Sequence, residues 1–189
     1  MATTAPERSP VFNLPNQLTA ARLVLAFVLF ALIEYHHWEW AFTVFAVAAF
    51  TDWLDGYLAR KLNLGSTLGR NLDPLVDKVL ICGAYIFLVS VDDSGFRAWM
   101  AVVVVARELI ITSLRGYLES LGAVFGADML GKVKMTLQCA ALIAVLVALE
   151  WPGNATLYLA RDIFIYAMLA ATALSGIQYL YRAFAMLRR

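Results

Sequence analysis

The chain has 189 residues, of which 62% are hydrophobic and 15% are charged. This composition excludes a highly charged disordered protein and is atypical of a soluble globular one, so lipid is the expected solvent. Fifteen Lys and Arg against fourteen Asp and Glu give a formal net charge of +1, so no basic excess indicates nucleic acid as a partner. The function of the charges must therefore be argued from their positions.

Six apolar segments follow one another along the chain, each near the roughly 20 residues that a membrane-spanning helix needs. They cover residues 19–35, 38–59, 72–91, 98–118, 131–150 and 156–187. Turn-forming residues separate several of them, at 92–95, 122–126 and 152–154. We expect an all-α integral membrane protein with six transmembrane helices. It would form a single domain over residues 1–189, with 1–17 as a cytoplasmic segment before the first helix.

Basic residues are concentrated on one side of this expected topology. If the N-terminus is cytoplasmic, thirteen of the fifteen basic residues fall at cytoplasmic ends or loops, and only Arg97 and Arg161 fall outside. Lys and Arg are enriched in the cytoplasmic loops of membrane proteins. The expectation is a multi-pass protein of a bacterial inner membrane, with both termini in the cytoplasm.

Charged residues interrupt the cytoplasmic part of the first five segments. The uncharged runs that remain are each too short, at about 1.5 Å per residue, to cover a ~30 Å hydrocarbon core. Ionisable groups inside a membrane pair with one another or face an aqueous cavity, so we expect one polar cavity that opens to the cytoplasm. The alternative is that the charges only snorkel to the interface. That suits long Lys and Arg side chains but not short Asp side chains.

Two helix faces, on the second and third segments, combine acidic residues with very small ones. The spacings i, i+3, i+4, i+7 and i, i+4, i+8 place these residues together: Asp52, Asp55, Gly56 and Ala59, then Gly69, Asp73 and Asp77. Four converging carboxylates need compensation, and two divalent cations would balance their charge. Oxygen ligands favour hard ions such as Mg²⁺, Mn²⁺ or Ca²⁺.

The small residues beside the aspartates indicate that a bulky group must approach closely. A nucleoside diphosphate is a suitable candidate, because a bare backbone leaves room for it next to the metals. The alternative is that Asp52 and Asp77 cap helices and pair with Arg60 and Lys78. That alternative accounts for two acids but not for four on facing stripes.

The sequence between residues 52 and 77, DWLDGYLARKLNLGSTLGRNLDPLVD, resembles the signature of the CDP-alcohol phosphotransferase family. That signature reads D-x2-D-G-x2-A-R-x8-G-x3-D-x3-D, and every fixed position is filled. The six-segment pattern agrees with the six-helix membrane fold of this family. The segments NLPNQLTAARLVL, ARELIITSLRGYLES and GADMLGKVKMTLQ are most similar to members that use CDP-diacylglycerol and glycerol 3-phosphate.

The resemblance implies transfer of a substituted phosphate from a CDP-linked donor to an alcohol, with release of CMP. It implies two divalent cations, Mg²⁺ or Mn²⁺, held on the donor pyrophosphate by Asp52, Asp55, Asp73 and Asp77. It also implies that Asp77 is the general base for the attacking hydroxyl. The CDP pocket would comprise Gly56, Ala59, Arg60 and Gly69, completed by Asn16 and Thr19. The alternative for Asn16 and Thr19 is an N-cap of the first helix.

Four basic residues at the cytoplasmic ends of the fourth and fifth segments are candidates for binding a phosphate on the acceptor. They are Arg107, Arg115, Lys132 and Lys134. Free serine, choline or inositol would not need this much positive charge, whereas glycerol 3-phosphate or inositol phosphate would. The alternative is anchoring at the membrane surface, with Glu108 and Glu119 as partners.

The expected reaction is transfer of the phosphatidyl group from CDP-diacylglycerol to glycerol 3-phosphate, giving phosphatidylglycerophosphate and CMP. Within the family, the alternative acceptors are inositol phosphate and phosphatidylglycerol. From another class, the alternative is a small cation transporter with carboxylates in its pathway. The resemblance further implies a homodimer in contact with membrane lipid.

Overall fold

The computed structural model describes residues 14–62, 67–121 and 129–187. Within these ranges the side chains of 14–16, 53–62, 67–71, 73 and 187 lie outside the described part. The described chain is helical throughout apart from short turns and contains no strand. The helices are α1 (Leu14–Glu34), α2 (Trp38–Leu62), α3 (Thr67–Leu88), α4 (Ala98–Ser120), α5 (Met129–Glu150) and α6 (Ala155–Leu187).

Each helix contains most or all of one predicted apolar segment, so the all-α class is confirmed. The helices α1, α2 and α3 extend further than the apolar residues alone predict, because the helical backbone continues through polar residues at their ends. As a result, the whole spacing pattern of the acidic faces lies within helices. The predicted turns at 92–95 and 152–154 are confirmed, with positive φ at Asp93, Gly95 and Gly153. The predicted turn at 122–126 lies outside the described residues.

Three of the described helices are long and apolar enough to cross a membrane, at Gln17–Glu34, Met129–Glu150 and Ala155–Met186. The outer surface is apolar as well. Large hydrophobic side chains such as Val24, Leu109 and Ile177 are more than 60% exposed. An exposed apolar surface of this extent indicates a membrane protein.

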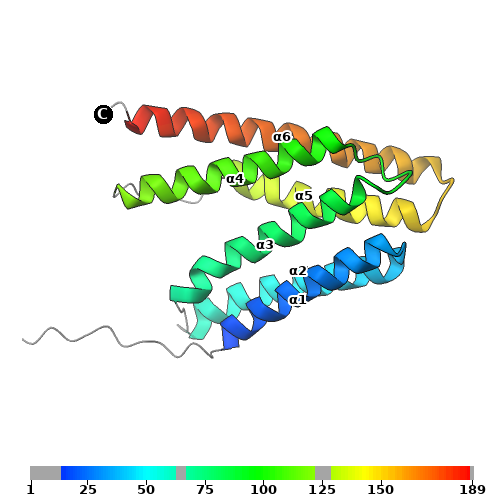
Figure 1. Cartoon of the computed structure of the whole chain (residues 1–189), viewed down its shortest axis with the longest axis horizontal. Coiled ribbons are helices and arrows are strands. Elements are labelled where there is room, and N and C mark those ends of the chain that lie inside the picture. The colour runs from blue at the N-terminus through cyan, green and yellow to red at the C-terminus, as the bar shows by residue number, and fades with distance from the viewer. Residues whose placement is uncertain (1–13, 63–66, 122–128, 188–189) are drawn as a thin grey trace, which may run out of the picture.

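The helices form a bundle in which successive helices run in opposite directions (Figure 1). The turns after α1, α3 and α5 lie at the right-hand end in Figure 1, whereas the start of α1 and the end of α6 lie at the left-hand end. Helix α1 packs on both α2 and α3, and α6 packs on both α4 and α5. Contacts of α2 with α5, and of α3 with α4 and α5, join these two groups. The first and last helices therefore leave the bundle at the same end.

Among the described side chains, the main apolar cluster lies in one half of this bundle. Its buried residues come from the second half of α1, α3 and α5 and from the first half of α2, α4 and α6, that is, from the end with the three turns. Among them are Leu29, Phe45, Tyr85, Val104, Leu146 and Met168. Most of the buried polar and charged residues lie in the other half, and these are Thr19, Arg22, Glu108, Lys134, Gln138, Thr172 and Ser175. The end of the bundle nearer the termini thus carries the polar interior.

Helix α1 packs closely on α3 at a glycine. A Cβ added to Gly83 would lie 2.2 Å from Cζ of Phe30, well inside van der Waals contact. The Phe30 ring in turn stacks on Phe87, with ring centroids 5.3 Å apart. The absence of a side chain at Gly83 thereby lets α1 and α3 approach closely in the apolar half of the bundle.

Candidate active site

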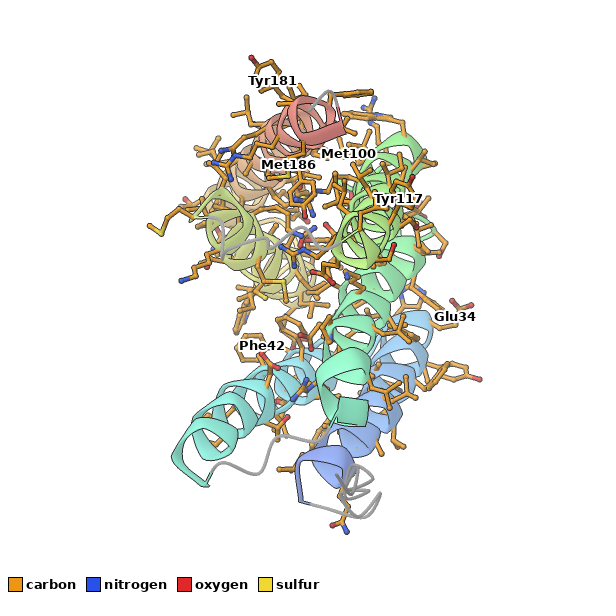
Figure 2. All side chains as sticks on the ribbon, turned by 90° about the vertical axis from the view of Figure 1, so that its left-hand side faces the viewer. Glu34, Phe42, Met100, Tyr117, Tyr181 and Met186 are labelled. Atoms are coloured by element: carbon orange, nitrogen blue, oxygen red, sulfur yellow. The ribbon has the colours of Figure 1, made fainter. Side chains whose placement is uncertain are left out.

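Two cavities lie in the polar half of the bundle. The larger, which we call the basic cavity, has a volume of about 360 Å³, and its charged lining residues are Asp77, Lys78, Arg107, Glu108, Arg115, Lys132 and Lys134. The smaller, which we call the aspartate cavity, has a volume of about 280 Å³ and is lined by Arg22, Asp52 and Asp77 beside mainly apolar residues. Figure 2 looks onto this end of the bundle, where side-chain nitrogen and oxygen atoms gather between α4 and α5. Asp77 belongs to both cavities.

Arg22 joins two of the predicted metal-binding aspartates. Its Nη1 atom lies 2.9 Å from Oδ1 of Asp52 and 3.0 Å from Oδ1 of Asp77. Arg22 comes from α1, Asp52 from α2 and Asp77 from α3, so the ion pairs connect three helices. The alternative prediction paired these two acids with Arg60 and Lys78. The structure instead pairs both of them with Arg22.

The other two predicted ligands lie on the same helices, but their side chains are outside the described part. Helix α2 continues past Asp55, one turn after Asp52, and α3 already includes Asp73, one turn before Asp77. Residues three or four apart share a helix face, so the two aspartate positions of each helix lie on one side of it. The backbone therefore agrees with one acidic face on each helix, and the facing of the two stripes stays a prediction.

The predicted CDP pocket falls largely outside the described side chains. This applies to Asn16, Gly56, Ala59, Arg60 and Gly69, whose backbone lies in α1, α2 and α3. Thr19 is described and is buried, one turn before Arg22 on α1. Because α1 begins at Leu14, neither Asn16 nor Thr19 is at its N-cap position, and that alternative is wrong.

A buried ion-pair cluster forms one wall of the basic cavity. Oε1 of Glu108 accepts hydrogen bonds from Nζ of Lys134 at 2.5 Å and from Nη1 of Arg107 at 3.0 Å. The other terminal nitrogen of Arg107 donates to Oγ of Ser175 at 3.0 Å. Two cations share one carboxylate, so the cluster keeps a formal charge of +1 beside the cavity. Such a charge, held out of bulk water, favours an anion in the cavity.

Arg115 and Lys132 line the same cavity with less burial. Nε of Arg115 donates to the hydroxyl of Tyr179 at 3.2 Å, and the distance from this nitrogen to Oε1 of Glu119 is 4.0 Å. Lys132 is exposed on the first turn of α5. The partners expected under the anchoring alternative, Glu108 and Glu119, are present. The structure nevertheless brings all four predicted basic residues into one cavity together with Asp77.

Comparison with known proteins shows the family of this chain. The family model described as CDP-alcohol phosphatidyltransferase matches residues 12–177. The chain belongs to the CDP-alcohol phosphatidyltransferase family. The resemblance of the 52–77 segment is thereby confirmed.

Relatives within this family cover nearly the whole chain. A protein of Bacillus subtilis (strain 168) named CDP-diacylglycerol--glycerol-3-phosphate 3-phosphatidyltransferase is 36% identical, over 89% of this chain and 94% of its own length. Proteins with the same name from Escherichia coli (strain K12) and Salmonella typhimurium are 36% and 34% identical, each over 84% of this chain and 92% of its own length. The chain is therefore similar to these enzymes over most of its length.

The described residues fit the divalent cations expected of a CDP-alcohol phosphatidyltransferase. Asp52 and Asp77 converge from two helices and offer only oxygen donors, which hard cations prefer. Both already bind a cation, the guanidinium of Arg22, so their position favours positive charge. Among the described side chains no group of three or more His, Cys, Asp and Glu is placed to hold a metal, and Asp55 and Asp73 are outside that set.

Four residues that line or support the cavities were not predicted as site residues. Arg22 was counted only as a cytoplasmic charge, and Gln138, Ser175 and Tyr179 were not singled out. A signal existed for Gln138, because a polar side chain one turn after Lys134 extends the polar face of α5 into an apolar run. A signal existed for Ser175 and Tyr179 too, because they follow Thr172 at the spacing i, i+3, i+7 and so share one polar face of α6.

Proposed function

We propose that this chain transfers the phosphatidyl group of CDP-diacylglycerol to glycerol 3-phosphate and releases phosphatidylglycerophosphate and CMP. The observation that carries this proposal is the place of Asp77, which lines both the aspartate cavity and the basic cavity. A donor at the aspartates and an anionic acceptor at the basic residues would meet at this carboxylate. The names of the three relatives above describe the same reaction.

The donor would bind across α2 and α3. Two divalent cations, Mg²⁺ or Mn²⁺, held by Asp52, Asp55, Asp73 and Asp77, would stabilise negative charge on the donor pyrophosphate. Gly56, Ala59 and Gly69 leave room for the cytidine end because they carry little or no side chain. Arg60, Asn16 and Thr19 complete this CDP pocket, while the acyl chains stay among the exposed apolar side chains in the bilayer.

The acceptor would bind in the basic cavity through its phosphate. Arg107, Arg115, Lys132 and Lys134 supply the positive charge, of which Glu108 neutralises one unit. A planar guanidinium can donate two parallel hydrogen bonds to a phosphate, which fixes the orientation of the bound molecule. An acceptor without a phosphate lacks this anchor, so the cavity favours glycerol 3-phosphate over free alcohols.

The reaction itself is a displacement at phosphorus next to Asp77. The carboxylate of Asp77 takes the proton of the acceptor hydroxyl while the oxygen attacks the phosphorus that carries the diacylglycerol. The bond from this phosphorus to the oxygen of CMP breaks, and CMP leaves with the electron pair. The basic residues hold the acceptor phosphate throughout, so binding and proton removal use separate groups.

The proposed topology places this site in the cytoplasmic half of a bacterial inner membrane, with all six helices spanning the bilayer. Two observations support it. The first and last helices leave the bundle at the same end, and the polar half lies at that end (Figure 1). The cavities would then open to the cytoplasm, from which the water-soluble glycerol 3-phosphate would enter. Both termini would be cytoplasmic as well. A single domain over 1–189 that functions as a homodimer completes the proposal.

The decisive experiment offers the purified protein, in vesicles that contain CDP-diacylglycerol and Mg²⁺, one acceptor at a time. We expect release of CMP with glycerol 3-phosphate and much slower release with glycerol, inositol phosphate or phosphatidylglycerol. Faster release of CMP with inositol phosphate or with phosphatidylglycerol would show that the faster of these two is the acceptor. Metal-dependent cation flux through the vesicles without any CMP would instead favour the transporter.

A further inference from the structure

Gln138 is a buried amide on the wall of the basic cavity. It follows Lys134 by one turn of α5 and lines the cavity together with Asp77. The residue is only 1% exposed, and its side-chain nitrogen has no hydrogen-bond partner within the described part of the chain. The backbone at this position is held in place, because the hydroxyl of buried Tyr85 donates to the Gln138 carbonyl at 2.7 Å.

A buried amide nitrogen without a partner is unfavourable, since it has lost its hydrogen bonds to water. Such groups are uncommon in native proteins, and each needs an explanation. Glu108, an acceptor that lines the same cavity, is already bound through Oε1 to Arg107 and Lys134. A molecule in the cavity that Gln138 lines is a further candidate partner for the amide.

The Gln138 amide and the basic side chains would contact different parts of the acceptor. A phosphate is bound most strongly by the guanidinium and ammonium groups, so the neutral amide is better matched to a hydroxyl. The reacting hydroxyl must release its proton toward Asp77, and a hydrogen bond donated to its oxygen would make that oxygen a poorer nucleophile. A second hydroxyl, which takes no part in the reaction, has no such conflict.

We propose that Gln138 donates a hydrogen bond to the non-reacting hydroxyl of a polyol phosphate acceptor and thereby selects acceptors that carry this hydroxyl. The inference rests on the proposed function and adds the group that recognises the middle of the acceptor. Gln138 is a specificity residue in this role. It orients the carbon chain between the phosphate and the reacting oxygen.

The test compares two acceptors that differ by one hydroxyl. Glycerol 3-phosphate carries the non-reacting hydroxyl, and 3-hydroxypropyl phosphate lacks it but keeps the phosphate and the reacting hydroxyl. We expect the unmodified protein to use glycerol 3-phosphate with a kcat/KM about tenfold higher, the size of one hydrogen bond to a buried partner. Equal kcat/KM values for the two acceptors in the unmodified protein would overturn the proposal without any variant.

The substitution Gln138→Met keeps the length of the side chain and removes the amide. We expect the preference between the two acceptors to fall about tenfold, to near unity, while the KM for CDP-diacylglycerol stays the same. Gln138→Met with the full original preference would overturn the proposal. The matched control is Thr172→Val, a buried polar residue that bonds Sδ of Met168 and lines neither cavity, for which the preference stays unchanged.

The same experiment separates this inference from the proposed function. No CMP from the unmodified protein with either acceptor means that the proposed function is wrong, and the role of Gln138 with it. CMP from both acceptors at equal rates means that only the role of Gln138 is wrong. Binding of the two acceptors without the donor, measured by calorimetry, gives a second readout of the same tenfold preference.

Discussion

The guanidinium of Arg22 and the carboxylate of Asp77 form an ion pair between α1 and α3, with Nη1 and Oδ1 3.0 Å apart. The same nitrogen lies 2.9 Å from Asp52, so one arginine compensates a carboxylate on each of two helices. Arg22 is 1% exposed, and its charge is therefore poorly screened by water. We interpret it as the fixed positive charge that allows the two aspartates to approach.

Arg22→Gln tests this interpretation through stability. We expect the Tm in detergent to fall by about 5 °C, because both carboxylates lose a charged hydrogen-bond donor worth roughly 1.5–3 kcal/mol. Added Mg²⁺ would raise the Tm of Arg22→Gln more than that of the unmodified protein, since the metal replaces the missing charge. Arg97→Gln, at an exposed arginine near the opposite end, is the control. Equal stability of the two variants would contradict the interpretation.

Asp77→Asn tests the general base. The amide keeps the size of the side chain but cannot accept the proton, so we expect kcat to fall by about 10²–10⁴ with little change in the acceptor KM. The measurement is CMP release at saturating Mg²⁺ and substrates. Asp92→Asn, an exposed acid in the turn after α3, should retain full activity. Full turnover by Asp77→Asn would rule out the base role.

Arg115→Ala tests the acceptor phosphate site. Its Nε is 3.2 Å from the hydroxyl of Tyr179, and the side chain is about half exposed, so its loss should leave the fold intact. We expect the KM for glycerol 3-phosphate to rise about tenfold or more, the effect of losing one charged hydrogen bond, with the KM for CDP-diacylglycerol unchanged. Equal increases in both values would show that Arg115 does not act on the acceptor.

Glu108→Gln tests the buried cluster. Removing this carboxylate leaves Lys134 and Arg107 without their shared anion, which costs about 3–5 kcal/mol for a buried pair. We expect a large drop in Tm that glycerol 3-phosphate partly restores, because its phosphate supplies negative charge beside the same cations. The control is Glu119→Gln. The exposed carboxylate of Glu119 is 4.0 Å from Arg115, so its removal should lower the free energy of unfolding by less than about 1 kcal/mol. Similar effects of both variants would contradict this account.

Gly83→Ala tests the contact between α1 and α3. The new Cβ would lie 2.2 Å from Cζ of Phe30, so we expect a loss of about 1–3 kcal/mol, measured as a lower Tm. The double variant Phe30→Leu with Gly83→Ala should recover part of the loss, because the smaller side chain makes room. Gly116→Ala, on α4 with nothing within 4 Å of the added Cβ, should be neutral or slightly stabilising. No loss in Gly83→Ala would show that the ring simply moves aside.

Much of the site was predictable because helical periodicity is a local property. Asp52 and Asp55 lie on one face of α2, and Asp73 and Asp77 on one face of α3, wherever these segments are helical. The four basic residues were predictable as a group, because they occupy the same ends of α4 and α5. The choice between binding a substrate and anchoring to the surface was not, since that depends on what the side chains face.

The pairing of these groups depends on contacts between distant parts of the chain. Arg22 and Asp77 are 55 residues apart, and Glu108 and Lys134 are 26 apart. Which arginine neutralises an aspartate, and which cation is bound by a glutamate, follows from the rotation of each helix about its axis. That rotation is set by the packing of many side chains at once, as at Gly83 and Phe30.

By itself, the sequence determined the six helices, one acidic face on each of α2 and α3, and the family, because composition, spacing and motif need no knowledge of packing. Only the tertiary structure decided that Arg22 bridges Asp52 and Asp77, that Asp77 belongs to two cavities, and that the amide of Gln138 is buried without a partner. The physical reason is that burial and pairing belong to groups of helices packed together, whereas periodicity belongs to each helix alone.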